Sequence, residues 1–233
     1  MHNGIIILDF GSQYNQLIAR RIREMGVYAE ILPYNTPLET IQEHQPKGLI
    51  LSGGPASVYA DNAPSIDTQI LEMGLPILGI CYGMQLIVHL SEGVVENAQQ
   101  REFGKAEMHH KRPEHPMLFG LPKSSQVWMS HGDHVSELPP GFDVLARTDS
   151  ALAMIGHRDK PQYAVQFHPE VTHSTYGAQI LHNFVFDICQ TKENWSMHNY
   201  IENMVAEIRK KVGKEHVILG LSGGVDSSVA ATL

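Results

Sequence analysis

The sequence contains only two cysteines among its 233 residues, Cys81 and Cys189. They lie far apart and follow no regular spacing, which excludes a disulfide framework and a cysteine-based zinc site. Each cysteine must therefore be interpreted from its own surroundings.

Long apolar runs and clusters of basic residues are also missing. The apolar stretch near the N-terminus is interrupted by Asp9 and Gly11, so it is too short for a signal sequence or a membrane-spanning helix. The net charge is −8, with 17 Lys and Arg against 25 Asp and Glu, and it argues against partnership with nucleic acid or an anionic membrane. We expect a cytoplasmic protein that acts on small molecules.

Short apolar runs that alternate with helical patterns predict an α/β fold, an open and mostly parallel sheet flanked by helices. The expected strands are residues 4–9, 28–32, 48–52 and 76–80, and the expected helices are residues 14–25, 37–44, 65–73 and 83–90. Shorter strands over residues 125–129, 143–148, 151–157 and 162–166 predict an antiparallel extension of this sheet. A helix over residues 176–190 is expected to close the first domain.

The remaining residues predict a second, truncated α/β domain. We place the first domain at residues 1–190, a polar linker at 191–196 and the second domain at 197–233. The second domain is expected to contain an amphipathic helix at 197–212 and a strand at 217–220.

Cys81 lies at the centre of the segment Gly79-Ile80-Cys81-Tyr82-Gly83, between a predicted strand and a predicted helix. Glycines two residues to either side permit the sharp turn that presents a nucleophile above a sheet edge, next to a helix N-terminus. Most free cysteines are merely small buried hydrophobic residues, and we interpret Cys189 in this way because it lies inside a helix.

A cysteine nucleophile needs a histidine to carry the proton and a third group to orient the imidazole. The chain has 14 histidines, but His168 alone follows an apolar strand and precedes Pro169-Glu170. Proline favours an extended conformation for the residue before it, and residues two apart in an extended segment face the same side. We therefore predict that His168 and Glu170 meet Cys81 at the carboxyl edge of the sheet.

The Gly53-Gly54-Pro55 turn follows the third strand, and the backbone N–H groups of Gly54 and Tyr82 are candidate oxyanion donors. An ordinary strand-to-helix turn would have the same composition. The segment His131-Gly132-Asp133-His134 permits a metal site with His168, although a loop that lines the pocket explains it more simply.

Near the C-terminus, a loop of glycine and serine follows a predicted strand and opens a helix, where backbone N–H groups bind phosphate. The loop consists of Ser222, Gly223, Gly224, Val225, Asp226, Ser227 and Ser228. It lacks the lysine that the Walker pattern requires before its terminal serine or threonine, so it is not an ordinary P-loop.

Taken together, the segments GICYGMQ, SGGP, QFHPEVTH and SGGVDSS resemble the GMP synthase family over the whole chain. That resemblance implies that Cys81 attacks the side-chain amide of glutamine, that His168 protonates the departing ammonia, and that Glu170 holds His168. It further implies that Gln85, Ser130 and Gly132 bind the glutamine. The triad segments alone would fit any class I glutamine amidotransferase, which has a flavodoxin-like fold.

The resemblance also implies a second chemistry. The ammonia would aminate XMP to GMP in purine biosynthesis, and the SGGVDSS loop would bind ATP, which the complete synthetase uses with Mg²⁺. No cofactor is expected for glutamine hydrolysis itself. The sequence ends five residues after Ser228, so most of the synthetase domain and its dimerisation region are missing, and a homodimer is expected only for the full-length enzyme.

Two other functions stay open at this stage. A module that only binds glutamine or a partner domain would not need the three triad residues, and a metal-dependent hydrolase would give Cys81 no role. Relative to the family, Glu92 stands where a second glycine is common, which we expect to alter the turn after the helix that follows Cys81.

Overall fold

The structure, a computed structural model, describes residues 3–232, apart from the side chains of residues 97–102, 203 and 207. Residue 233, the last of the predicted second domain, lies outside the described residues. The chain divides into two compact units, Met1–Asn194 and Trp195–Leu233.

The first unit is built on a nine-stranded sheet with the strand order β2-β1-β3-β4-β9-β8-β7-β5-β6. Its parallel part consists of β1 (Ile5–Asp9), β2 (Ala29–Pro33), β3 (Gly48–Leu51), β4 (Ile77–Ile80) and β9 (Gln162–Val165). The predicted α/β class and its parallel strands are thereby confirmed. Strands buried on both faces read as continuous apolar runs, which is why they could be recognised.

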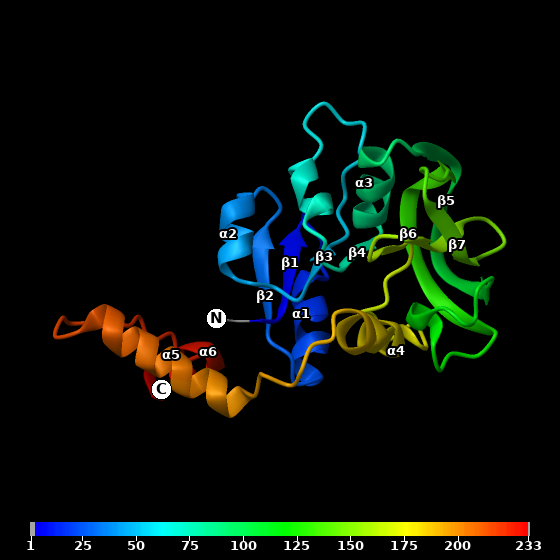
Figure 1. The fold of residues 1–233 in the computed structure, drawn as a ribbon. Coiled ribbons are helices and arrows are strands. Elements are labelled where there is room, and N and C mark those ends of the chain that lie inside the picture. Colours follow the sequence, from blue (N-terminus) through cyan, green and yellow to red (C-terminus); the bar gives the residue numbers. More distant parts are fainter. Residues whose placement is uncertain (1–2, 233) are drawn as a thin grey trace. The chain divides into compact units, whose positions relative to one another are not determined.

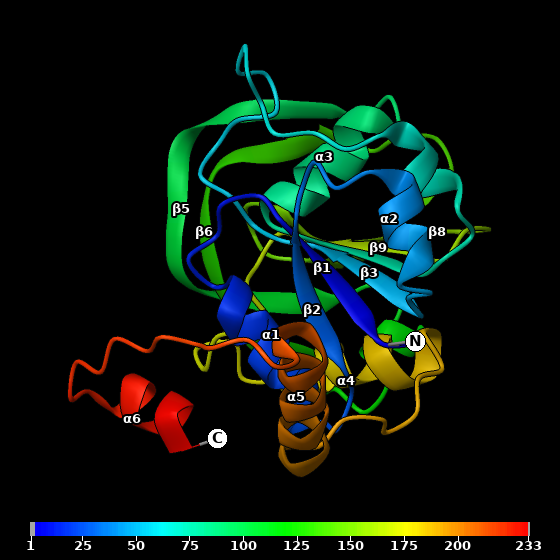
Figure 2. The same cartoon turned by 90° about the vertical axis from the view of Figure 1, so that its left-hand side faces the viewer.

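The antiparallel extension is larger than the sequence suggested. It consists of β5 (Val94–His110), β6 (Ser124–Glu137), β7 (Phe142–Arg147) and β8 (Leu152–His157). Strand β5 was missed because it is rich in charged residues. Strand β6 was predicted to end at Met129, but its strict alternation continues with the polar residues His131 and Asp133 at the buried positions. Figure 2 shows the two long strands running side by side.

Each face of the sheet carries its own apolar core. In β1, Ile5 and Ile7 belong to the core beneath α1 (Asn15–Glu24) and α4 (Gly177–His182), whereas Ile6 and Leu8 belong to the core beneath α2 (Leu38–Glu43) and α3 (Tyr82–Leu90). The helices therefore cover both faces, as Figures 1 and 2 show. The parallel connection between β3 and β4 contains only a short 3-10 helix, η1 (Thr68–Glu72), where a third α-helix was predicted.

The predicted closing helix is interrupted after its first turns. Helix α4 continues into a π-helical segment, η3 (Asn183–Ile188). Buried Asn183 donates from Nδ2 to the carbonyl oxygens of Met117 (3.1 Å) and Phe119 (2.9 Å) in and beside the short helix η2 (Pro116–Leu118). This insertion of an amide into the core accompanies the wider helical turn.

Residues 191–194, which follow η3, are hydrogen bonded to the rest of the first unit. Thr191 donates its hydroxyl to the carbonyl of Val185 at 2.8 Å, and the backbone N–H of Asn194 donates to Gly26 at 2.9 Å. Two residues of the predicted linker, Thr191 and Asn194, thus hydrogen bond to the rest of the first unit. Our assignment of functional domains to residues 1–190 and 197–233 stays a prediction.

The second unit contains two helices, α5 (Met197–Val212) and α6 (Val225–Thr232). The Ser196 side chain caps α5 by accepting from the N–H of Asn199 at 3.1 Å. The strand predicted at 217–220 does not form, and Ile218 is 98% exposed. An apolar run becomes a strand only where another strand pairs with it, and none does so among the described residues. Within residues 3–232 no helix has the length and apolar content needed to cross a membrane.

Helix α3 ends in a Schellman motif with an unusual residue at its left-handed position. The N–H of Gly93 donates to Val88 at 2.9 Å and that of Glu92 to His89 at 3.4 Å, while Glu92 has a φ of 70°. Glycine is the usual residue here because a Cβ is disfavoured at positive φ. Glu92 therefore leaves the turn intact and strains it instead.

We expect Glu92→Gly to stabilise the protein by about 0.5–1 kcal/mol, since it removes left-handed strain that exceeds the added flexibility of the unfolded chain. Exposed Glu43, the last residue of α2, provides the matched control because it is not among the residues with positive φ, and Glu43→Gly should destabilise the protein by about 0.5–1 kcal/mol. Urea unfolding of both variants measures the difference. Equal destabilisation by the two changes would contradict the interpretation.

Candidate active site

Cys81 lies on a strained turn between β4 and α3. Its backbone has φ 51° and ψ −103°, a conformation that costs energy for a residue with a side chain. A Cβ on Gly79 would lie 2.5 Å from the carbonyl oxygen of Gly83, and a Cβ on Gly83 would overlap the backbone of Leu51. Both flanking glycines are thus required by close packing, and the turn places the sulfur at the N-terminal end of α3.

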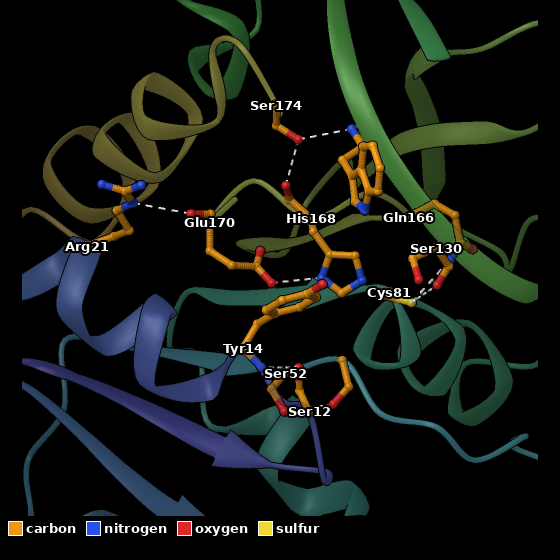
Figure 3. A network of polar contacts seen from close by, with 12 residues as sticks. Ser12, Tyr14, Arg21, Ser52, Cys81, Ser130, Gln166, His168, Glu170 and Ser174 are labelled. Carbon is orange, nitrogen blue, oxygen red and sulfur yellow. Dashed lines mark hydrogen bonds and ion pairs between the residues drawn. The ribbon is translucent and has the colours of Figure 1, made fainter. Parts of the chain in front are cut away.

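The structure brings Cys81, His168 and Glu170 together, as the sequence predicted they would lie. The Nδ1 of His168 is 2.7 Å from the Oε1 of Glu170, and both side chains are almost fully buried. Figure 3 shows the imidazole between Glu170 on one side and Cys81 on the other. Because Nδ1 donates to the carboxylate, Nε2 is left to exchange a proton with the sulfur.

The neighbours of His168 favour its charged form. Burial of the imidazole lowers its pKa, but the hydrogen bonds and charges of Cys81 and Glu170 outweigh burial and raise the pKa of His168 to about 10. The folded protein therefore keeps this imidazole protonated at neutral pH, whereas a free imidazole titrates near 6.5. An imidazolium next to the sulfur favours the thiolate, which is the nucleophilic form of cysteine.

The backbone around His168 is anchored to β6 and α1. The N–H of His168 donates to Trp128 at 3.1 Å, and the Ser174 hydroxyl donates to the His168 carbonyl at 2.6 Å. Arg21 donates from Nε to the carbonyl oxygen of Glu170 at 3.2 Å. The ring of Tyr14 lies edge-on to the imidazole, with centroids 5.2 Å apart (Figure 3). The first three contacts fix the backbone that carries the imidazole, and Tyr14 packs against the ring itself.

Cys81 and His168 open into a pocket of about 600 Å³. Its walls come from the loop after β1, the loop after β3, the turn at Cys81 and strand β6. The lining residues are Gly11, Ser12, Gln13, Tyr14, Gly54, Pro55, Ala56, Ser57, Cys81, Gln85, Phe103, Ser130, His131, Gly132, Asp133 and His168. A pocket of this size accommodates an amino acid.

The predicted glutamine-binding residues Gln85, Ser130 and Gly132 all line this pocket. Gln85 also donates from Nε2 to the carbonyl of Asp133 at 2.8 Å, which ties α3 to β6. Ser130 lies close to the sulfur, since Cys81 Sγ is 3.6 Å from its carbonyl oxygen.

Of the two predicted oxyanion donors, Gly54 lines the pocket, where a Cβ would lie 2.5 Å from the carbonyl oxygen of Phe10. The side chain of Tyr82 is buried elsewhere, and its hydroxyl donates to Pro64 at 2.5 Å. Tyr82 can therefore serve only through its backbone N–H in the first turn of α3, where such groups lack helical partners.

Sequence reasoning missed two neighbours of the catalytic candidates. Tyr14 was interpreted only as the start of a helix, and Gln166 was not singled out at all. Gln166 nevertheless lies two residues before His168, so the alternation that placed Glu170 beside His168 also predicts its side. Its Nε2 is 3.8 Å from Cys81 Sγ.

The structure gives no support to a metal site formed by residues 131–134 with His168. In the part of the chain that the structure describes, no three His, Cys, Asp or Glu side chains are arranged to hold an ion. His131 bonds through Nδ1 to the carbonyl of Asp133 at 3.0 Å, and both residues form part of the pocket wall.

The candidate nucleotide loop in the second unit forms a turn that leads into α6. Gly223 has a φ of 80°, and the hydroxyls of Ser222 and Ser227 lie 3.1 Å apart. Ser228 donates to the carbonyl of Gly224 at 2.9 Å. Ser227 donates to the same carbonyl at 3.0 Å. Backbone N–H groups at the start of a helix are the kind of donor that binds phosphate.

Comparison with known proteins agrees with this fold. The profile of the family Glutamine amidotransferase class-I matches residues 6–188, and that of the family NAD synthase matches residues 197–233. A solved structure from Thermoplasma acidophilum superposes with a TM-score of 0.69 at 32% identity, covering 85% of this chain and 96% of that one. The chain therefore belongs to the class I glutamine amidotransferase family.

Two curated relatives extend the comparison over both units. The protein of Fusobacterium nucleatum is 58% identical over 99% of this chain, and that of Caldicellulosiruptor saccharolyticus is 55% identical over all of it. Both bear the name GMP synthase [glutamine-hydrolyzing]. The chain spans 45% of the length of each, a little under half.

Replacement of Glu170 by Gln should lower the pKa of His168 toward 6.5, because the variant loses the negative charge that helps to hold the imidazolium. The stabilising contribution of this proton is present below pH 6.5 and is lost as the pH rises through about 10, so the variant should lose that dependence. NMR titration of the imidazole, assigned with His168→Gln, measures the pKa. Glu72→Gln, at an exposed ion pair with Lys160, is the control and should leave the titration unchanged.

Proposed function

We propose that the first unit hydrolyses glutamine with Cys81 as nucleophile, His168 as proton carrier and Glu170 as the group that orients the imidazole. One observation carries this proposal: the sulfur on its strained turn faces an imidazole whose Nδ1 lies 2.7 Å from a buried carboxylate. Cys81 and His168 line the same pocket, which is large enough for an amino acid.

The chemistry follows from these positions. The thiolate of Cys81 attacks the amide carbon of glutamine, and the carbonyl oxygen becomes an oxyanion. The imidazolium of His168 donates its Nε2 proton to the amide nitrogen, so the C–N bond breaks and ammonia leaves. His168, now neutral, accepts a proton from water, which attacks the glutamyl thioester and releases glutamate and the thiolate.

Backbone groups stabilise the charge that develops on the oxygen. The proposed donors are the N–H group of Gly54 in the loop after β3 and that of Tyr82 in the first turn of α3. Gln85, Ser130 and Gly132 hold the amino-acid part of glutamine in the pocket, where the last two present backbone groups of β6. Binding at these positions orients the amide toward Cys81.

For the whole protein, the names of the curated relatives support transfer of the ammonia to XMP with formation of GMP. Residues Ser222 to Ser228 would hold the phosphates of ATP through the N–H groups at the start of α6 and the serine hydroxyls. ATP with Mg²⁺ supplies the activation of the XMP carbonyl oxygen. The remaining part of the synthetase domain is the proposed partner of this chain, and the homodimer belongs to the full-length enzyme.

A module that binds glutamine without hydrolysing it is the alternative to an enzyme. The strain at Cys81 favours the enzyme, because a binding pocket has no need for a cysteine held at φ 51° beside an imidazolium.

Cys81→Ala should reduce ammonia release from glutamine by about a thousandfold or more, since no other group can form the thioester. A coupled glutamate dehydrogenase assay measures the ammonia. Cys189→Ala is the matched control, because Cys189 lies in the apolar core and burial raises the pKa of its thiol. Equal loss in both variants, or activity that survives in Cys81→Ala, would refute the assignment.

This chain alone should form no GMP from glutamine, XMP and ATP. Ammonia from an isolated first unit would escape to solvent. The loop before α6 would contact only the phosphates of ATP, so we expect its affinity for ATP to be poor. Chromatographic detection of GMP tests this directly. Addition of the remaining segment of a curated relative should restore GMP formation. GMP formed without that segment would contradict the assignment of GMP formation to the complete synthetase domain.

A further inference from the structure

The sulfur of Cys81 has two polar contacts besides the imidazole, and the two have opposite character. The carbonyl oxygen of Ser130, at 3.6 Å, can only accept a hydrogen bond. The Nε2 of Gln166, at 3.8 Å, can only donate one. A thiol therefore satisfies Ser130, whereas a thiolate satisfies Gln166.

The buried amide of Gln166 lowers the stability of the fold, and apolar packing does not require an amide at this position. Its side chain is 1% exposed, and among the described residues its Oε1 has no hydrogen-bond partner. A buried acceptor without a partner destabilises a protein, and a methionine of similar shape would avoid that penalty. The amide is therefore best explained by what its nitrogen does for the sulfur.

The backbone holds the amide in place. Gln166 directly follows β9, and its N–H donates to Ala153 at 3.0 Å in the neighbouring strand β8. The N–H of Cys81 donates to Val165 at 2.8 Å, so the nucleophile and the segment that carries Gln166 are joined by a backbone bond. Figure 3 shows the amide of Gln166 beside Cys81, across from His168.

We propose that Gln166 is a hydrogen-bond donor to the Cys81 thiolate, one that stabilises the charged sulfur and holds it in line with the pocket. A hydrogen bond to an anion is stronger than one to a neutral group, so the contact gains strength when the thiol gives its proton to His168. When His168 turns toward the leaving nitrogen, the Gln166 amide still donates to the sulfur and so keeps the sulfur in its position. This role rests on the proposed nucleophile.

Other titratable groups face the same space and must stay constant in a test. They are His168 with Glu170 behind it, His131 and Asp133 on β6, and Tyr14 in the loop after β1. A change at position 166 that preserves side-chain shape leaves each of them in place.

Gln166→Met in a Cys189→Ala background tests the role. Iodoacetamide reacts with the thiolate by forming an S–C bond while iodide leaves, so its rate at each pH reports the charged sulfur without requiring glutamine hydrolysis. We expect the rate at pH 7 to fall about tenfold, the factor that one hydrogen bond to a charged group supplies, and the pH profile to move to higher pH. The thermal midpoint should stay the same or rise.

Gln162→Met, in the strand that Gln166 directly follows, provides the matched control. Gln162 is also buried, but its Nε2 donates to the carbonyl of Leu71 at 2.6 Å, away from the sulfur. This variant should lose stability because Leu71 loses its donor, and it should alkylate with the unchanged profile. If Gln166→Met fails to fold, Gln166→Leu takes its place with the same expectation.

An unchanged profile in Gln166→Met, or an equal shift in Gln162→Met, would overturn the proposal. Failure of the proposed function would look different: the parent chain would release no ammonia while its alkylation still responded to the change at position 166.

Discussion

The parallel pairing of β4 with β9 is the interaction on which the active site depends. Ile80 pairs with Val165, and each strand ends at that level, so Cys81 and the Gln166-to-Glu170 segment emerge side by side at one edge of the sheet. The two strands are separated by more than 80 residues in sequence, among them the whole antiparallel extension up to β8. A shift of this register by one residue would turn the nucleophile and its base to opposite faces.

Strain and close packing convert that edge into a reactive site. The turn at Cys81 is held in an unfavourable backbone conformation because Gly79 and Gly83 allow α3 to pack directly on β4 and β3. Burial of apolar side chains in the two cores, one on each face of the sheet, offsets the backbone strain at Cys81. Within the site, a buried carboxylate and the sulfur keep the imidazole charged despite its burial.

Much of this arrangement could be predicted because it follows from local patterns. Continuous apolar runs identified the parallel strands, the glycine spacing identified the turn at Cys81, and alternation around Pro169 placed His168 beside Glu170. Strand β5 could not be found in this way, since Glu96, Lys105 and Glu107 are exposed and its pairing with β6 and β7 makes it a strand. The run at 217–220 has the composition of a strand yet is exposed for want of such pairing.

The sequence by itself determined the α/β class and the local motifs that make Cys81, His168 and Glu170 candidates, because each motif depends on residues close together in the chain. Only the tertiary structure decided what surrounds the sulfur. Gln166, Ser130 and Tyr14 reach the site from different strands and loops, and their distances to Cys81 and His168 depend on how the sheet is assembled. Contacts across a sheet edge follow from strand order and register, which no local pattern specifies.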